Sequence, residues 1–148
     1  MSKTKTIFIA GLVAGTLDAI AAILLFAHPV TLHNISNIFR YIASGLVGQG
    51  AFANGLVYPF LGLFLHFLIA TIWAAVYLLL LYRLFKPGSV LAKTILLAAL
   101  IWIIMNGFVM PLSGLGAARS NGWAIMRSFG VLVICVGLPI TLIVEKRK

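Results

Sequence analysis

Long apolar runs separated by shorter, more polar segments dominate the pattern along this chain. A helix needs about 20 apolar residues to cross the hydrocarbon core of a bilayer. Four runs reach that length, at residues 7–27, 56–81, 90–109 and 123–144. Successive spans through one bilayer alternate in direction. The pattern therefore predicts an all-α fold: an integral membrane four-helix bundle with up-down topology, in a single membrane domain over residues 1–148.

The segment between the first and second runs has a different pattern. Over residues 34–47 the apolar side chains recur on one helical face and the polar side chains occupy the other. The segment is too short and too polar to cross a bilayer. We expect a short interfacial or re-entrant helix here. A connecting loop with a single helical turn is the alternative.

One acid interrupts the first apolar run. It is Asp18, and Glu145 near the C-terminus is the only other acid in the chain. A charged side chain at membrane depth is costly, and such residues face the interior of a bundle or a water-filled cavity. Gly11 and Gly15 fall on the same helical face as Asp18. Because small residues let membrane helices approach closely, we expect Asp18 to point into the bundle.

The second run carries a similar face of small residues around a histidine. Gly62, His66 and Ala70 recur every four residues. We predict that Gly11, Gly15, Gly62 and Ala70 are the helix-packing residues. Counted from the outer ends of their predicted spans, Asp18 and His66 lie at similar depth, so they are expected to face each other.

The third run adds Asn106, closer to the outer end of its span. Asp18, His66 and Asn106 form the predicted intramembrane polar site. Arg40 and Arg127 lie near the outer ends of their segments and are predicted counter-charges. Ionisable groups at membrane depth are typical of proton or ion pathways and substrate sites. The alternative is an interhelical hydrogen bond that only holds the bundle together, and such bonds contribute about 0.6 kcal/mol.

The basic residues predict the orientation. If the N-terminus is cytoplasmic, eight of the eleven Lys and Arg residues fall on the inner side and Arg40, Arg119 and Arg127 fall outside. The positive-inside rule therefore places both termini in the cytoplasm. The net charge of +9 does not point to nucleic acid, because the basic residues are not gathered on one soluble face. The expected partners are the lipid bilayer, a small-molecule or ion ligand, and a second copy of the chain in a homo-oligomer.

Composition narrows the class further. The chain is 63% hydrophobic and 9% charged, whereas soluble domains carry about 25% charged residues. The single cysteine, Cys135, excludes an intrachain disulfide. His28 and His33 have no cysteine or acid near them in the sequence, so no metal site and no cofactor are predicted. The sequence also lacks a recognisable nucleophile, base and acid set, so an enzyme is not the favoured interpretation.

Three segments carry a family resemblance. They are Gly11-Leu-Val-Ala-Gly15-Thr-Leu-Asp18-Ala, Leu63-Phe-Leu-His66-Phe-Leu-Ile-Ala70, and Met105-Asn-Gly-Phe-Val-Met-Pro111-Leu-Ser. The chain resembles small bacterial inner-membrane proteins and is similar in layout to the YagU-like proteins. The resemblance implies a four-span protein of the bacterial inner membrane and implies no particular reaction.

Three functional hypotheses follow from the sequence. The favoured one is proton- or ion-linked binding or transport of a small solute at the intramembrane polar site. The alternative is a non-catalytic structural or partner-binding membrane subunit. The third is a membrane enzyme or a ligand sensor.

Overall fold

The computed structural model of this chain describes residues 1–84, 88–113 and 121–147, and these residues contain helices and no strand. The α-helices are α1 (Lys3–Phe26), α2 (Leu32–Val47), α3 (Val57–Val76), α4 (Tyr82–Leu84), α5 (Val90–Ile104), α6 (Met110–Leu112), α7 (Gly122–Val131) and α8 (Leu138–Glu145). A short 3-10 helix over Gly48–Phe52 follows α2. The predicted all-α class is confirmed.

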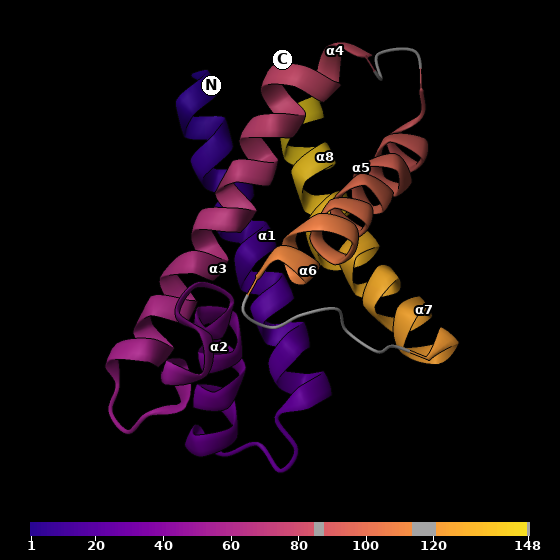
Figure 1. Ribbon diagram of the computed structural model, residues 1–148. Helices are drawn as coiled ribbons and strands as arrows, with labels where there is room; N and C mark the ends of the chain where they lie inside the picture. The colour runs from indigo at the N-terminus through magenta and orange to yellow at the C-terminus, as the bar shows by residue number, and fades with distance from the viewer. Residues whose placement is uncertain (85–87, 114–120, 148) are drawn as a thin grey trace.

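Four continuous helices are long and apolar enough to cross a membrane (Figure 1). They cover Lys3–Phe26, Val57–Leu84, Val90–Leu112 and Gly122–Glu145. In each of the last three, a π-helical segment joins two α-helices: Tyr77–Leu81, Met105–Val109 and Leu132–Gly137. The protein is thus a multi-pass membrane protein, and the predicted four-helix membrane bundle is confirmed.

Polar residues at the edges of the apolar runs start the helices. The side chains of Ser2, Thr31, Ser89 and Asn121 each accept a hydrogen bond from a backbone N–H three residues later. This is the usual N-cap arrangement, which satisfies an N–H group that has no partner inside the helix. The N-cap at Thr31 starts α2 two residues before the segment 34–47, for which the sequence predicts an amphipathic helix.

Prolines follow two of the π-helical segments. Pro111 comes two residues after Met105–Val109, and Pro139 comes two residues after Leu132–Gly137. A proline inside a helix has no N–H to donate, and its ring clashes with the carbonyl four residues earlier. Widening the preceding turn to the π form relieves that clash. Tyr77–Leu81 has no proline after it within the same helix.

Small residues mark where the helices come closest. A Cβ atom added to Gly11 would lie 2.6 Å from Cα of Thr71, and one added to Gly15 would lie 2.7 Å from Cδ1 of Phe67. These two glycines therefore set the crossing of α1 and α3. A Cβ added to Gly62 would overlap the backbone carbonyl of Phe39. Gly62 thus seats α2 on α3 and does not pack against another span.

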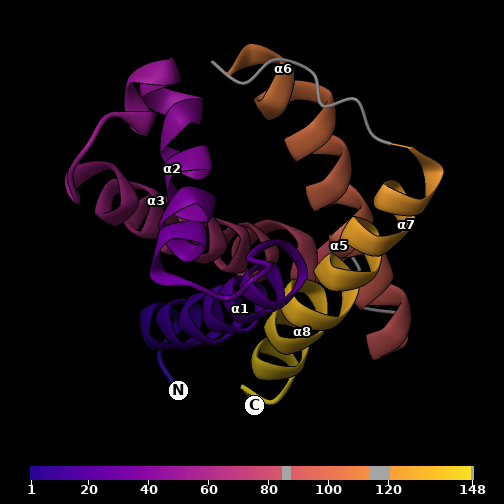
Figure 2. The same cartoon turned by 90° about the horizontal axis from the view of Figure 1, so that it is seen from below.

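The four spans form an open row and not a closed square. In the described residues, α1 packs against α3 on one side and against α8 on the other, and α5 packs against α8 and the π-helical segment Leu132–Gly137. Helices α3 and α5 make at most marginal contact with each other. Figure 2 shows α2 and α3 on one side and α5 and α6 on the other, with α1 and α8 between them along one edge.

The buried core lies toward the end of the bundle that holds both chain termini (Figure 1). We call this end the closed end. Its core consists of Ala10, Ala14, Trp73, Ala74, Tyr77, Leu78, Leu97, Ile101, Val136, Ile140 and Val144. At the opposite end, formed by the last turns of α1 together with α2, the start of α3, α6 and α7, the helices diverge. We call it the open end.

Large apolar side chains cover the outer surface of the spans. Phe8, Leu12, Phe64, Leu80 and Ile134 are each more than half exposed. Apolar surface on this scale would be unusual for a soluble monomer. In a bilayer the same side chains face acyl chains, which is the environment that the length and composition of the helices require.

Candidate ligand-binding site

An aspartate and a histidine from neighbouring spans face each other in the open half of the bundle. Oδ2 of Asp18 in α1 lies 4.0 Å from Nε2 of His66 in α3. The side chains are 27% and 12% exposed, respectively. A separation of 4.0 Å is an ion-pair distance and is too long for a direct hydrogen bond. The two groups therefore lie close enough to influence each other's charge without a direct hydrogen bond between them.

The position of the imidazole is fixed by its own contacts. Nε2–H of His66 donates a hydrogen bond to the backbone carbonyl of Gly15, at 2.8 Å. Because a carbonyl can only accept, Nε2 must carry a proton. The rings of Phe39 and Phe67 meet the imidazole edge-on, with centroid distances of 6.4 and 5.5 Å. His66 is thus held by α1, α2 and its own helix.

The predicted polar residues share one cavity. A space of about 750 Å³, which we call the vestibule, lies at the open end between α1, α2, α3, α7 and the π-helical segment of the third span. Its polar lining residues are Asp18, His28, Asn34, Asn37, Tyr41, His66, Asn106, Arg127 and Ser128. Its volume falls in the range typical of small-molecule sites. Asp18, His66 and Asn106 therefore come together, although Asn106 is not in contact with the other two by any hydrogen bond between described residues.

A smaller pocket continues from the vestibule toward the core. It has a volume of about 160 Å³, and Asp18, Ile42 and His66 line both spaces. The rest of its lining is apolar: Ile69, Ala70, Trp73, Ile101, Met105, Leu132 and Val136. We call it the inner pocket. Trp73, Ile101 and Val136 also belong to the buried core, so the pocket ends where the closed end begins. The Asp18–His66 pair lies at the junction of a polar and an apolar space.

Asn106 and Arg127 lie on the wall of the vestibule that faces α2. The side-chain amide of Asn106 donates to the carbonyl of Trp102 in its own helix, at 3.0 Å. The guanidinium carbon of Arg127 lies 5.0 Å from the centroid of the Phe26 ring. This is a cation–π geometry. Arg127 therefore lines the same cavity as Asp18 and His66, and its part as a counter-charge stays a prediction.

Arg40 is bonded to the loop that follows α2. Its guanidinium donates to the backbone carbonyls of Ala51, Ala53 and Gly55, and its Nε donates to the Ser36 hydroxyl. These bonds tie α2 to the loop that follows it. The guanidinium thus contacts the carbonyls of this glycine-rich loop and does not line the vestibule, and the part of Arg40 as a counter-charge stays a prediction.

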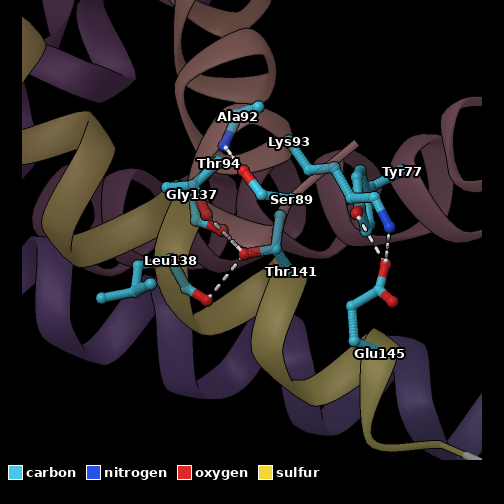
Figure 3. Close-up of polar contacts among 9 residues, drawn as sticks. All are labelled: Tyr77, Ser89, Ala92, Lys93, Thr94, Gly137, Leu138, Thr141 and Glu145. Atoms are coloured by element: carbon cyan, nitrogen blue, oxygen red, sulfur yellow. Dashed lines mark hydrogen bonds and ion pairs between the residues drawn. The ribbon is translucent and has the colours of Figure 1, made fainter. Parts of the chain in front are cut away.

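A second polar cluster, at the closed end, was missed by the sequence reasoning (Figure 3). Nζ of Lys93 donates to Oε1 of Glu145 at 2.9 Å, and the hydroxyl of Tyr77 lies 3.5 Å from the same oxygen. The Lys93 side chain is only 6% exposed. Beside it, the hydroxyls of Thr94 and Thr141 are 2.7 Å apart. The sequence contains one signal for this cluster, because Lys93 and Glu145 fall at the same end of neighbouring antiparallel spans.

In the part of the chain that the structure describes, no three His, Cys, Asp or Glu side chains are grouped to hold a metal ion. Comparison of the chain with protein-family models, with curated proteins and with solved structures finds no match. The resemblance to the YagU-like proteins therefore stays a prediction. The case for a function rests on the geometry of the vestibule and the inner pocket.

Proposed function

We propose that this protein binds a small solute in the vestibule and moves it across the bacterial inner membrane, in a process linked to protonation of the Asp18–His66 pair. One observation carries the proposal. The only acid of the first span lies 4.0 Å from the only histidine of the second span, where an open cavity that contains many polar side chains meets a deeper, almost wholly apolar pocket.

The physical basis is the cost of charge at membrane depth. An isolated ion in an apolar environment is strongly disfavoured, whereas a carboxylate beside a protonated imidazole is compensated. If a solute binds one protonation state more tightly than the other, its binding is coupled to the uptake or release of a proton. A cavity that is open at one end and blocked by packed side chains at the other also suits alternating access.

The distribution of basic residues supports an orientation with the vestibule outside. Among the described residues, Lys3, Lys5, Arg83, Lys93, Lys146 and Arg147 lie toward the closed end, and Arg40 and Arg127 lie toward the open end. By the positive-inside rule the closed end and both termini are cytoplasmic.

Cysteine labelling tests this orientation. Cys135 is the only cysteine, so Cys135→Ser provides a clean background. In intact cells we expect a membrane-impermeant maleimide to label Asn121→Cys at once and Ser2→Cys only after permeabilisation. The reverse pattern would contradict the proposed orientation.

A second function is favoured by the hydrogen bond from His66 to the Gly15 carbonyl. This bond joins α1 to α3 without any contribution from the Asp18 carboxylate. The polar residues would then hold the helices of a structural or partner-binding subunit together, as interhelical hydrogen bonds do in other membrane proteins. In that case the protonation of Asp18 would have no consequence for any ligand.

A binding experiment separates the two functions. Purified protein in nanodiscs is incubated with an extract of bacterial small molecules and lipids at about pH 6 and about pH 8, on either side of the ordinary histidine pKa. Retained compounds are measured by mass spectrometry. We expect at least one compound whose retention changes several-fold between the two conditions.

Asp18→Asn preserves hydrogen bonding and removes the titration, so it should abolish the pH dependence. Glu145→Gln, at the other acid of the chain, is the matched control and should keep the pH dependence. Two results would favour the structural function. One is that no compound is retained above an empty-nanodisc control, and the other is that retention has the same pH dependence in Asp18→Asn as in the unmodified protein.

A further inference from the structure

The inner pocket is bounded by two helices that do not close it. Ile69 and Trp73 of α3 line one side, and Ile101 of α5 with Met105 just beyond its end line the other. Among the described residues, α3 and α5 make at most marginal contact with each other. Seen from below, α3 and the helix formed by α5 and α6 lie on opposite sides of the molecule (Figure 2). Toward the closed end, Trp73 of α3 and Ile101 of α5 belong to one buried core, so an entry from the bilayer would lie between the open-end halves of these two helices.

The two cavities differ in chemistry. The vestibule is lined by amides, hydroxyls, histidines, Asp18 and one arginine together with Ala22, Phe26, Ile38 and Ile42, whereas the inner pocket is apolar apart from Asp18 and His66. A ligand that fills both spaces must have a polar part in the vestibule and an apolar part at membrane depth. Burial of the apolar part contributes about 0.8 kcal/mol for each CH₂ group. This combination of spaces fits an amphiphile better than a solute that is polar throughout.

The charges of the vestibule indicate the sign of the head group. The chain has two acids, and both have basic partners: Asp18 has His66 and Glu145 has Lys93. Asp18 and Arg127 both line the vestibule, and among the described residues no ion pair joins Arg127 to a carboxylate. Its guanidinium has an aromatic neighbour in Phe26. An anionic group from outside the chain would complete this site, because arginine binds carboxylate and phosphate with paired hydrogen bonds.

We propose that the ligand is an anionic amphiphile that enters from the bilayer between α3 and α5. Its head group occupies the vestibule beside Arg127, and its apolar chain lies in the inner pocket against Ile69 and Met105. The junction of head and chain then lies beside the Asp18–His66 pair. This inference names the substrate class of the proposed function and rests on it. A membrane-resident amphiphile and a water-soluble anion share the anionic chemistry, so the test includes both.

Photolabelling provides the test. The protein is reconstituted in nanodiscs of phosphatidylcholine, which has no net charge, and is exposed to hexadecanoic acid carrying a diazirine on its chain. We expect labelled peptides from α3 and α5. The corresponding hexadecanol probe should label about tenfold less, which is the lower end for loss of a hydrogen bond to a charged group. Unlabelled hexadecanoate should compete, and butyrate at the same concentration should not.

Matched variants assign the two parts of the ligand. Arg127→Gln should lower labelling by the acid about tenfold. Arg83→Gln, at an exposed arginine of the closed end, should not lower it. Met105→Trp fills the inner pocket and should block labelling, whereas Ile103→Trp, at a residue that is 52% exposed in the same helix, should not.

The possible results separate this inference from the proposed function. Equal labelling by acid and alcohol, equal effects of Arg127→Gln and Arg83→Gln, or full competition by butyrate would each overturn the anionic amphiphile. The Arg127 and Met105 variants test the amphiphile, and Asp18→Asn tests the proton linkage. If labelling by the acid responds to the Arg127 and Met105 variants as expected while pH-dependent retention is unaltered in Asp18→Asn, the proton linkage is rejected and the amphiphile is kept.

Discussion

The closed end and the open end each contain one acid beside one base, yet the two pairs lie in different surroundings. At the closed end Lys93 and Glu145 are 2.9 Å apart, and the lysine side chain is 6% exposed. At the open end Asp18 and His66 are 4.0 Å apart, and the carboxylate is 27% exposed and lines a cavity. Where packed side chains exclude water, a charge pair of this kind stabilises the fold. Where the pair lines a cavity, it remains available to a ligand.

Packing explains why the two ends differ. Around the closed-end pair, Tyr77, Leu97, Ile140 and Val144 are among the largest fully buried side chains. A salt bridge among such residues loses its hydration and must be satisfied by its own partner. At the open end the helices diverge, and α2 forms a wall of the vestibule. Four substitutions test this contrast, from the largest expected effect to the smallest.

Lys93→Met should have the largest effect, because it leaves the Glu145 carboxylate without its cation. Removing one partner of a buried ion pair lowers the free energy of unfolding by about 3 kcal/mol. Thermal unfolding in detergent would measure the loss. Lys5→Met, at an exposed lysine of the same end, is the control and should change little. Adding Glu145→Met to Lys93→Met should recover most of the stability. If Lys93→Met alone is as stable as Lys5→Met, the two ends do not differ in the way described.

Gly62→Ala should have the next largest effect, because its Cβ would overlap the Phe39 carbonyl where α2 sits on α3. Overpacking of this kind costs about 1–3 kcal/mol. The displacement of α2 should also expose it to protease while the closed end stays protected. Gly107→Ala is the matched control, since nothing lies within 4 Å of an added Cβ there. Equal protease sensitivity of the two variants would show that Gly62 does not hold the wall of the vestibule.

Asp18→Asn should change stability by less than about 1 kcal/mol. The carboxylate is partly exposed to the cavity, and the hydrogen bond of His66 goes to the Gly15 carbonyl and not to Asp18. Interhelical polar contacts contribute about 0.6 kcal/mol on average. The unfolding assay used for Lys93→Met provides the measurement. A loss as large as that of Lys93→Met would mean that the open-end pair is structural too.

Thr141→Val should have the smallest effect, about 0.6 kcal/mol, the average for a hydrogen bond between membrane helices. The variant removes the bond between the Thr141 and Thr94 hydroxyls, and Thr94 is 1% exposed. Thr16→Val, at an exposed threonine of α1, serves as the reference for unfolding. A loss above about 2 kcal/mol would show that the threonine pair, and not Lys93 and Glu145, dominates the polar part of the closed end.

The sequence predicts the elements of the fold well, because span length and amphipathicity are properties of local sequence. The four apolar runs correspond to the four long helices, and the segment beginning near Asn34 lies in α2. The sequence pattern did not predict the arrangement of the four spans in an open row. In apolar helices almost every face is hydrophobic, so hydropathy does not say which face contacts a neighbour and which faces lipid.

The polar site was accessible to sequence reasoning for an energetic reason. A lone aspartate in a membrane-length run demands a buried or hydrated environment, and Asp18 and His66 prove to be 4.0 Å apart. The partners of Arg40 and Lys93 were not accessible in this way. Lysine and arginine near the ends of spans are normally interpreted as charges that orient the protein in the membrane. Their contacts here, with loop carbonyls and with Glu145, depend on tertiary packing.

Infrared spectroscopy of isotope-labelled aspartate tests the environment of Asp18 most directly, since Asp18 is the only aspartate in the chain. With protein in nanodiscs titrated from acid to alkaline pH, we expect its carboxyl band to change from the protonated to the ionised form. Replacing the neighbouring imidazole by His66→Gln should displace the midpoint of that change. A carboxyl band that stays unchanged over this pH range would contradict a cavity-facing pair that exchanges protons. A midpoint that is the same in His66→Gln as in the unmodified protein would contradict it too.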